Sequence, residues 1–241
     1  MTATETRHNV VSRDEWLKAR LAHLTAEKEL SRKRDELSRQ RRELPWVRVE
    51  KNYVFEGPNG PERLADLFAG RSQLIVYHFM LGPGWKAGCP GCSFLCDHID
   101  GALPHLNHHD VTWTAVSSAP MNEIAAYKSR MGWKFPFVSS AGNSFNHDYR
   151  VSFSKEELAA GAVDYNFTRT PSDRANDELP GLSAFFKDKE GEIFHTYSSY
   201  ARGPEEIIGT LMILDRAPLG RNEDGIMNFV RRHDEYENAA E

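Results

Sequence analysis

The three cysteines of this chain gather in one short stretch, and that stretch limits the folds open to the chain. Cys89 and Cys92 form a Cys-X-X-Cys pair, and Cys96 follows one helical turn later. The pair comes after an apolar run from Leu74 to Met80 and a Gly/Pro loop, and a predicted helix that ends near Gly101 follows it. Three clustered cysteines are not the disulfide framework of a secreted protein, so we expect catalytic, redox or metal chemistry where a strand meets a helix.

A Cys-X-X-Cys pair in that position has a physical use. Unpaired N–H groups and the helix dipole stabilise a thiolate at the first position, which lowers the pKa of Cys89. Cys92 is close enough in sequence to close a disulfide without moving the backbone. Pro90 suits a first helical turn because its missing N–H would be unpaired there. Three glycines are expected to let the preceding loop approach a substrate closely: Gly82, Gly84 and Gly88.

Composition excludes several other classes of protein. The chain has 241 residues and a formal net charge of −5, which argues against binding nucleic acid through bulk charge. The longest apolar run, Leu74 to Leu81, is far shorter than the roughly 20 residues of a membrane helix. The segment Met1 to Ser12 lacks the apolar core of a signal peptide. We therefore expect a cytoplasmic protein with neither nucleic acid nor membrane as a partner.

Charge density and the pattern of apolar residues divide the chain into three parts. Residues 1–45 are expected to form a helical arm, which opens with a capping box from Ser12 to Glu15 and contains a seven-residue repeat. The repeat consists of Trp16, Leu30, Leu37 and Leu44. This stripe is too narrow for a core helix, so the arm would lie on the domain or on a second subunit, and a homodimer through the arm is one such arrangement. Residues 46–217 are expected to form one domain, and residues 218–241 a polar tail with a loose end.

Strand and helix signals alternate through the predicted domain. Strands are expected at 47–55, 74–80, 111–117 and 134–138, and helices at 64–68, 122–131 and 205–214. A hairpin joins 182–186 to 193–200, and a polar, aromatic insertion spans about 139–180. Five aromatic side chains are expected to anchor this insertion: Phe145, Tyr149, Phe153, Tyr165 and Phe167. The plan is that of an α/β protein with parallel strands joined by helices.

Several stretches carry a specific resemblance. They are Leu44–Val47, Leu74–Met80, Gly88–Ser93, Ala125–Trp133, Leu179–Ser183 and Phe194–Tyr197. In these stretches the chain resembles the DUF899 family of bacterial thioredoxin-like proteins, over nearly its whole length. The resemblance implies a thioredoxin-like fold, with a central mixed sheet flanked by helices, a long N-terminal helical arm and an insertion before the C-terminal hairpin.

Site residues also follow from the resemblance. Thioredoxins place a cis-proline before the hairpin, facing the disulfide, and Pro180 is the candidate here, with its register shifted by about one residue. An aromatic residue before the cysteine loop often shapes the substrate-facing surface, which makes Trp85 a candidate. The dipeptide Pro90-Gly91 stands where thioredoxin has Gly-Pro, so the redox potential does not carry over.

Other side chains have plainer interpretations. Cys96 is expected to be a buried apolar residue, and His78 a satisfied histidine of the core. A metal set of the three cysteines with His98 lacks the second ligand pair of structural zinc, so we expect no metal and no cofactor. A histidine cluster is expected to be solvated: His105, His108 and His109. Three aromatic residues are expected in the core: Trp133, Phe135 and Phe137.

The leading hypothesis is a thiol–disulfide oxidoreductase. Cys89 attacks the disulfide of a protein or small-molecule thiol substrate, Cys92 resolves the mixed disulfide, and an external reductant restores the pair. A second hypothesis is a peroxiredoxin-like peroxidase, which the opening Phe55 to Pro58 and the cysteine loop favour. The usual Pro and Thr before a single peroxidatic Cys are missing. A third hypothesis is a non-catalytic binding module with a vestigial or regulatory Cys-X-X-Cys pair.

Overall fold

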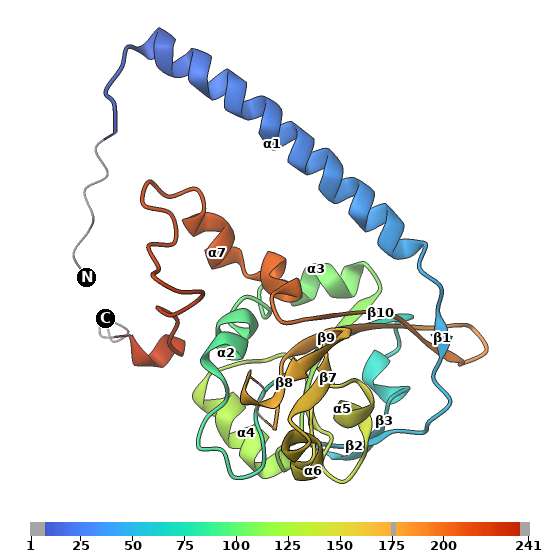
Figure 1. The fold of residues 1–241 in the computed structure, drawn as a ribbon. Helices are drawn as coiled ribbons and strands as arrows, with labels where there is room; N and C mark the ends of the chain where they lie inside the picture. Colours follow the sequence, from blue (N-terminus) through green and yellow to red (C-terminus); the bar gives the residue numbers. More distant parts are fainter. Residues whose placement is uncertain (1–7, 175–176, 237–241) are drawn as a thin grey trace. The chain divides into compact units, whose positions relative to one another are not determined.

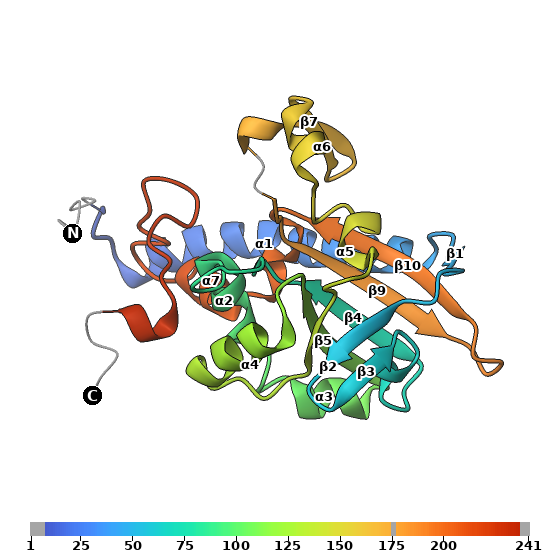
Figure 2. The same cartoon turned by 90° about the horizontal axis from the view of Figure 1, so that it is seen from below.

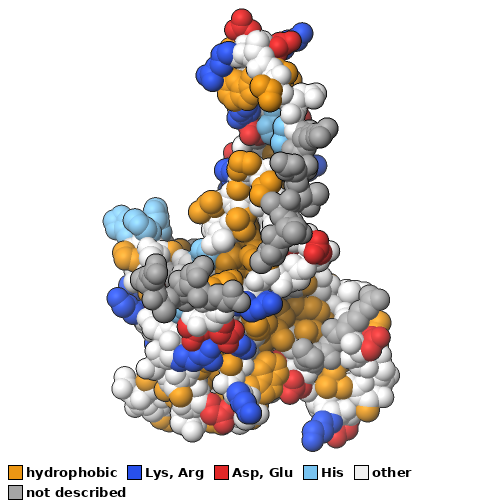
Figure 3. Space-filling view, turned by 90° about the vertical axis from the view of Figure 1, so that its left-hand side faces the viewer, with side chains coloured by type: hydrophobic (Ala, Val, Ile, Leu, Met, Phe, Trp, Pro, Cys, Tyr) orange, Lys and Arg blue, Asp and Glu red, His pale blue; other side chains and the backbone are white. Residues whose placement is uncertain are grey.

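The computed structural model describes residues 8–174 and 177–236, and the chain divides into two compact units. The first unit, residues 1–45, contains helix α1 (Arg13–Arg42). The capping box predicted from Ser12 and Glu15 begins this helix, and no described residue of α1 is buried. Apolar side chains along it are therefore part of the surface (Figure 3).

The second unit, residues 46–241, is built on one mixed sheet. In its described part the sheet has the order β1-β10-β9-β4-β5-β6-β2-β3. Figure 1 shows two of these neighbours, β9 and β10, side by side. The strands are β1 (Val47–Arg48), β2 (Val54–Gly57), β3 (Gly60–Arg63), β4 (Gln73–His78), β5 (Val111–Ser117), β6 (Phe137–Ser139), β9 (Gly181–Lys187) and β10 (Ile193–Tyr200). Strands β4, β5 and β6 run parallel, whereas β9 pairs antiparallel with β4 and with β10. A separate hairpin consists of β7 (Ala162–Tyr165) and β8 (Thr168–Pro171).

Helices cover both faces of the sheet (Figure 2). The α-helices of this unit are α2 (Pro90–Cys96), α3 (Leu103–His108), α4 (Met121–Arg130), α5 (Phe145–Asp148), α6 (Lys155–Ala159) and α7 (Gly209–Leu214). The 3-10 helices are η1 (Asp66–Phe68), η2 (Ser172–Arg174), η3 (Gly203–Ile207) and η4 (His233–Glu235). Side chains of α2, α3, α4 and α7 pack on one face, and those of η1 and α5 on the other.

Strand β4 shows why both faces are covered. Tyr77 belongs to the apolar cluster under α2 and α4, whereas Leu74 and Val76 belong to the cluster on the opposite face. Side chains alternate along a strand, so the continuous apolar run supplies both clusters at once. The result is the thioredoxin-like fold that the sequence predicted, with a mixed sheet between helices. No described helix is long and apolar enough to cross a membrane.

Some boundaries differ from the prediction. The strand expected over 47–55 is interrupted, and only its two ends pair in the sheet. The helix expected over 64–68 is the shorter 3-10 turn η1, and the closing helix is divided between η3 and α7. The helix after the cysteines also stops early, at Cys96, and α3 begins separately. A Pro lies in the first turn of both η3 and α3, where it starts a helix but cannot continue one.

The insertion contains the short helix α6, which a capping box from Ser154 to Glu157 begins, and also α5, β7 and β8, which its sequence did not suggest. Four of its predicted aromatic anchors are buried or half-buried in apolar clusters: Phe145, Tyr149, Phe153 and Tyr165. The fifth, Phe167, is 83% exposed at the tip of the β7–β8 hairpin, outside the apolar clusters, and its ring meets only that of Tyr200 edge to face among the described residues, with centroids 5.4 Å apart.

The described part of the C-terminal tail carries apolar side chains that pack on the domain. Val230 is only 5% exposed, and Met227 and Phe229 pack against the main core cluster. These contacts dock the described part of the tail on the domain. Residues 237–241, at the end of this tail, lie outside the described residues.

Candidate functional site

Cys89 begins helix α2 and is held in place by its own backbone. Its N–H donates to the carbonyl of Met80 at 3.0 Å, which brings the Gly/Pro loop back to the end of β4. Its carbonyl accepts from the amide and hydroxyl of Ser93, at 3.0 and 2.9 Å. Pro90 occupies the first helical turn, as predicted. The thiol of Cys89 is therefore fixed at the N-terminal cap of α2, and the residue is half-buried.

The surroundings of Cys89 favour its thiolate. The Cys92 thiol lies within hydrogen-bonding reach, and this contact is the largest influence that lowers the pKa of Cys89, to about 6. The amides of Cys92 and Gly91 and the charge of Arg232 lower the pKa further, against the opposing effect of burial. Free cysteine has a pKa of about 8.5, so Cys89 carries the reactive form at neutral pH.

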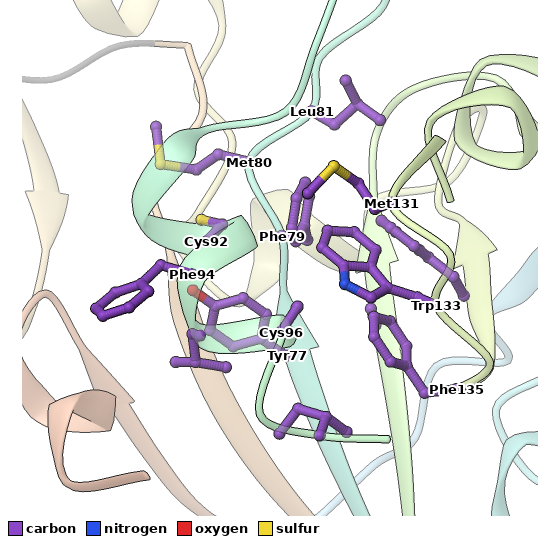
Figure 4. Close-up of a cluster of buried hydrophobic side chains, with 14 of the residues drawn as sticks. Tyr77, Phe79, Met80, Leu81, Cys92, Phe94, Cys96, Met131, Trp133 and Phe135 are labelled. Carbon is purple, nitrogen blue, oxygen red and sulfur yellow. The ribbon is translucent and has the colours of Figure 1, made fainter. Parts of the chain in front are cut away.

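Cys92 has the opposite environment. Its side chain is buried among Tyr77, Phe79 and Met80 (Figure 4). Burial and the neighbouring Cys89 raise the pKa of Cys92 well above its usual range. Both thiols are free rather than joined in a disulfide. One site thus holds a thiolate and a protonated thiol next to each other.

Arg232 is a site residue that the sequence reasoning missed. Its Nε and Nη2 atoms donate to the carbonyl of Gly88 at 2.9 and 2.6 Å, directly before Cys89. Its Nη1 atom donates to Glu235 at 2.7 Å, and only 17% of its side chain is exposed. A sequence signal existed, because Met227, Phe229 and Val230 interrupt an otherwise polar tail and would need a core to pack against.

Cys96 and His98 do not join the two thiols in a ligand set. Cys96 is fully buried, as expected. Both ring nitrogens of His98 are engaged, one with the carbonyl of Phe94 at 2.7 Å and one with Thr210 at 2.8 Å. Within residues 8–174 and 177–236, no group of three or more His, Cys, Asp or Glu side chains is arranged to hold a metal ion.

The structure also places the other polar and aromatic residues singled out in the sequence. His78 is 1% exposed and bonds to Ser183 at 2.9 Å, so it is the satisfied core histidine that was predicted. The predicted histidine cluster is exposed on and after α3: His105, His108 and His109. The three predicted core aromatics are all buried: Trp133, Phe135 and Phe137.

Pro180 and Trp85 were the predicted binding residues. Gly181 pairs with His78, so Pro180 stands level with Phe79 at the end of the sheet that leads to the cysteines. The peptide bond before Pro180 is trans, unlike that of the thioredoxin proline it was compared with. Its carbonyl accepts from the hydroxyl of Tyr165 at 2.7 Å, which ties the insertion to this edge. Trp85 is half-buried against the main core cluster, and its role in binding stays a prediction.

Gly88 serves a different purpose from the one expected. It is buried, and a Cβ atom there would stand 2.4 Å from the ring of Phe79 and 2.8 Å from that of Tyr127. The glycine therefore lets the backbone lie against core aromatics rather than against a substrate. This close approach is what places the Gly88 carbonyl and Cys89 beside β4.

Family membership follows from the whole chain. The model of DUF899, described as a bacterial protein of unknown function, matches residues 5–236. The chain belongs to the DUF899 family. No curated protein matches the sequence of this DUF899 protein.

Solved structures similar to this DUF899 protein include redox proteins. Peroxidoxin BcpB of Mycobacterium tuberculosis is 14% identical, with 70% of this chain and 97% of that chain covered and a TM-score of 0.44. Peroxiredoxin Q of Xanthomonas campestris is 12% identical, with 70% and 97% covered and a TM-score of 0.45. A Chlorobium tepidum protein assigned as the thiol:disulfide interchange protein DsbE is 10% identical, with 70% and 94% covered and a TM-score of 0.43.

Proposed function

We propose that this protein is a thiol–disulfide oxidoreductase in which Cys89 is the nucleophile and Cys92 the resolving thiol. The observation that carries the proposal is the contrast between two adjacent sulfurs. Cys89, at the cap of α2, has a pKa lowered to about 6, whereas burial raises that of Cys92. A nucleophile needs the thiolate form at neutral pH, and a resolving thiol must stay protonated until it is used.

The reaction runs in two exchanges. The Cys89 thiolate attacks one sulfur of a substrate disulfide, forms a mixed disulfide and releases the other sulfur as a thiolate. Cys92 then loses its proton, attacks the Cys89 sulfur and displaces the second substrate thiolate. The substrate gains two electrons and two protons, and the protein keeps a Cys89–Cys92 disulfide. An external dithiol reductant restores both thiols by the same exchange in reverse.

The first test is a redox titration of the full chain. The protein is equilibrated in mixtures of reduced and oxidised glutathione or dithiothreitol, and free thiols are alkylated and located by peptide mass. We expect a reversible Cys89–Cys92 disulfide with a definable potential, and Cys96 reduced throughout. If Cys89 and Cys92 remained unlinked across the range, the oxidoreductase proposal would be wrong and a binding module would replace it.

Variants separate the two thiol roles. Cys92→Ser is expected to accumulate the mixed disulfide on Cys89, since nothing displaces the substrate, and Cys89→Ser to form none. Cys96→Ala is the matched control, because Cys96 is buried on the same helix. A mixed disulfide on Cys92 in the Cys89→Ser variant would reverse the assignment.

Peroxide reduction is a second candidate. The half-buried position of Cys89 favours it, because a peroxide is smaller than any disulfide. The Cys89 thiolate would attack one oxygen of the O–O bond and become a sulfenic acid, and the other oxygen would leave as water or an alcohol after taking a proton from the solvent. Cys92 would then condense with the sulfenic acid to form the disulfide and release water. Consumption of hydrogen peroxide that depends on Cys89, with little exchange against oxidised glutathione, would favour this function.

A further inference from the structure

The described end of the chain lies along the whole of helix α2. We call residues 227–235 the C-terminal strap. At the start of α2, the Cε atom of Met227 lies 3.6 Å from the point where a Cβ of Gly91 would stand, and the Cys89 sulfur lies 3.9 Å from the same point. The methyl group of Met227 and the sulfur of Cys89 therefore both lie close to Gly91.

Further contacts continue along the helix. The rings of Phe229 and Phe94 meet edge to face, with centroids 6.2 Å apart. At the end of α2, Nδ1 of His233 lies 2.8 Å from a carboxylate oxygen of Asp97. The strap thus contacts α2 at its first turn, its middle and its C-terminal cap.

Three sets of contacts fasten the strap. Val230 is buried in the core, and Arg232 donates two hydrogen bonds to the carbonyl of Gly88. Arg130 of α4 binds Asp234 at 2.7 Å and Glu235 at 3.0 Å. Ion pairs at the surface are individually weak, so the buried Val230 and the largely enclosed Arg232 provide most of the attachment.

This position restricts what can reach Cys89. A folded protein substrate needs a contact area of several hundred square ångströms around the attacking sulfur, on the order of 800 Å² per partner for a stable complex. The strap lies against α2 and the residue before Cys89, where such a partner would have to make part of its contact. A small oxidant needs only a path to one sulfur atom.

We propose that the C-terminal strap limits the Cys89 site to small two-electron oxidants with an S–S or O–O bond, and excludes disulfides of folded proteins. The inference rests on the proposed thiol chemistry. Displacing the strap would then widen the range of substrates without changing either cysteine.

Two maleimides of very different size test directly whether the strap blocks large molecules from Cys89. Cys89 of the full chain is labelled with N-ethylmaleimide and with a maleimide on a long polyethylene glycol chain, and the labelled site is read by peptide mass. The ratio of the two rates cancels any change in thiolate reactivity. The variant is Val230→Asp, which places a charge in the buried anchor of a terminal segment. The matched control is Leu219→Asp, because Leu219 lies in the same C-terminal region but is 53% exposed.

We expect the wild type and Leu219→Asp to react far more slowly with the large reagent than with the small one. Val230→Asp should lower the ratio of the small-reagent rate to the large-reagent rate about tenfold. A tenfold change corresponds to a shift of roughly 1.4 kcal/mol toward the state in which the strap is released. Arg130→Met, which removes the ion pairs to α4, should have a smaller effect in the same direction. An unchanged ratio in Val230→Asp, with the fold intact by circular dichroism, would overturn the proposal.

Turnover with three oxidants tests which substrates Cys89 reduces with and without the strap in place. The wild type should react with oxidised glutathione or hydrogen peroxide but not with the disulfides of insulin, and Val230→Asp should gain insulin reduction. Which small oxidant reacts distinguishes the S–S source from the O–O source. Insulin reduction by the wild type at the rate of Val230→Asp would refute exclusion by the strap. If no oxidant reacts although maleimide labelling is size-selective, the proposed function fails while the steric role of the strap stands.

Discussion

Arg232 and Cys89 meet at one carbonyl, that of Gly88, and the charge of Arg232 is one of the influences that lower the pKa of Cys89. Alkylation of Cys89 by iodoacetamide should therefore rise through about pH 6 and level off near neutral pH, because only the thiolate reacts. Arg232→Met should move this midpoint to higher pH, since a positive charge near the thiolate is lost. Arg232→Lys should recover part of the shift because it keeps the charge.

The control for this pH profile is Arg63→Met. Arg63 also pairs with a carboxylate, that of Asp66, but on β3, which is separated from the strand before the cysteines by three others in the sheet. Its profile should match that of the wild type. An unmoved midpoint in Arg232→Met would show that Arg232 only fastens the strap.

Gly88 supports the site by fitting where no other residue does. A Cβ at this position would overlap the rings of Phe79 and Tyr127, and both rings lie in the core. Gly88→Ala should lower the free energy of unfolding by about 1–3 kcal/mol, the usual cost of overpacking. Gly101→Ala is the matched control, because a Cβ there meets nothing within 4 Å. Urea unfolding of both variants checks the prediction, and equal stability of the two would contradict it.

At the scale of the elements, the side chain of Glu178 ties the insertion to the end of strand β5. Its carboxylate accepts from Ser118, after β5, at 2.5 Å and from Ser152, in the insertion, at 2.8 Å. Burial raises the pKa of Glu178 to about 7, from 4.5 in an exposed chain. The folded state thus binds this proton more tightly than the unfolded state, and the group costs stability progressively as pH rises from about 4.5 to 7.

Glu178→Gln should remove that dependence. Its carbonyl oxygen accepts the same hydroxyl bonds but carries no charge, so the variant should gain up to about 3 kcal/mol over the wild type at pH 8. The gain should nearly vanish at pH 4.5. Urea unfolding at the two pH values measures it, and Glu156→Gln, on exposed α6, is the control. A gain of equal size at both pH values would show that charge is not the cause.

The structural elements differ in how well local sequence predicts them. The strand before the cysteines and the start of α2 were predictable, because apolar continuity and a Pro after Cys89 act locally. The C-terminal strap was not, because Arg232 bonds to Gly88 from the opposite end of the domain sequence and its energy comes from packing. The trans bond before Pro180 was equally out of reach, since the surrounding fold selects the isomer.

At the scale of the whole molecule, helix α1 has no role that its contacts explain, because none of its residues is buried. It is 30 residues long, has no buried residue, and is laced with ion pairs such as Arg39–Glu36 and Arg20–Glu27. Such pairs stabilise an isolated helix only slightly. Its apolar repeat is interrupted at His23 but includes Leu30 and Leu37, which are 53% and 51% exposed. A seven-residue apolar repeat is the pattern by which helices pair.

We therefore predict that the arm mediates self-association of the full chain. Light scattering after size exclusion should give a mass above that of the monomer, increasing with protein concentration. Leu30→Glu with Leu37→Glu should return the mass to that of the monomer, because each charge would have to be buried in a helix pair. Arg32→Glu, two residues from Leu30 and so on the opposite side of the helix, is the control and should retain the larger mass. A wild type that stays monomeric at high concentration would contradict the prediction, and the repeat would then need a different partner.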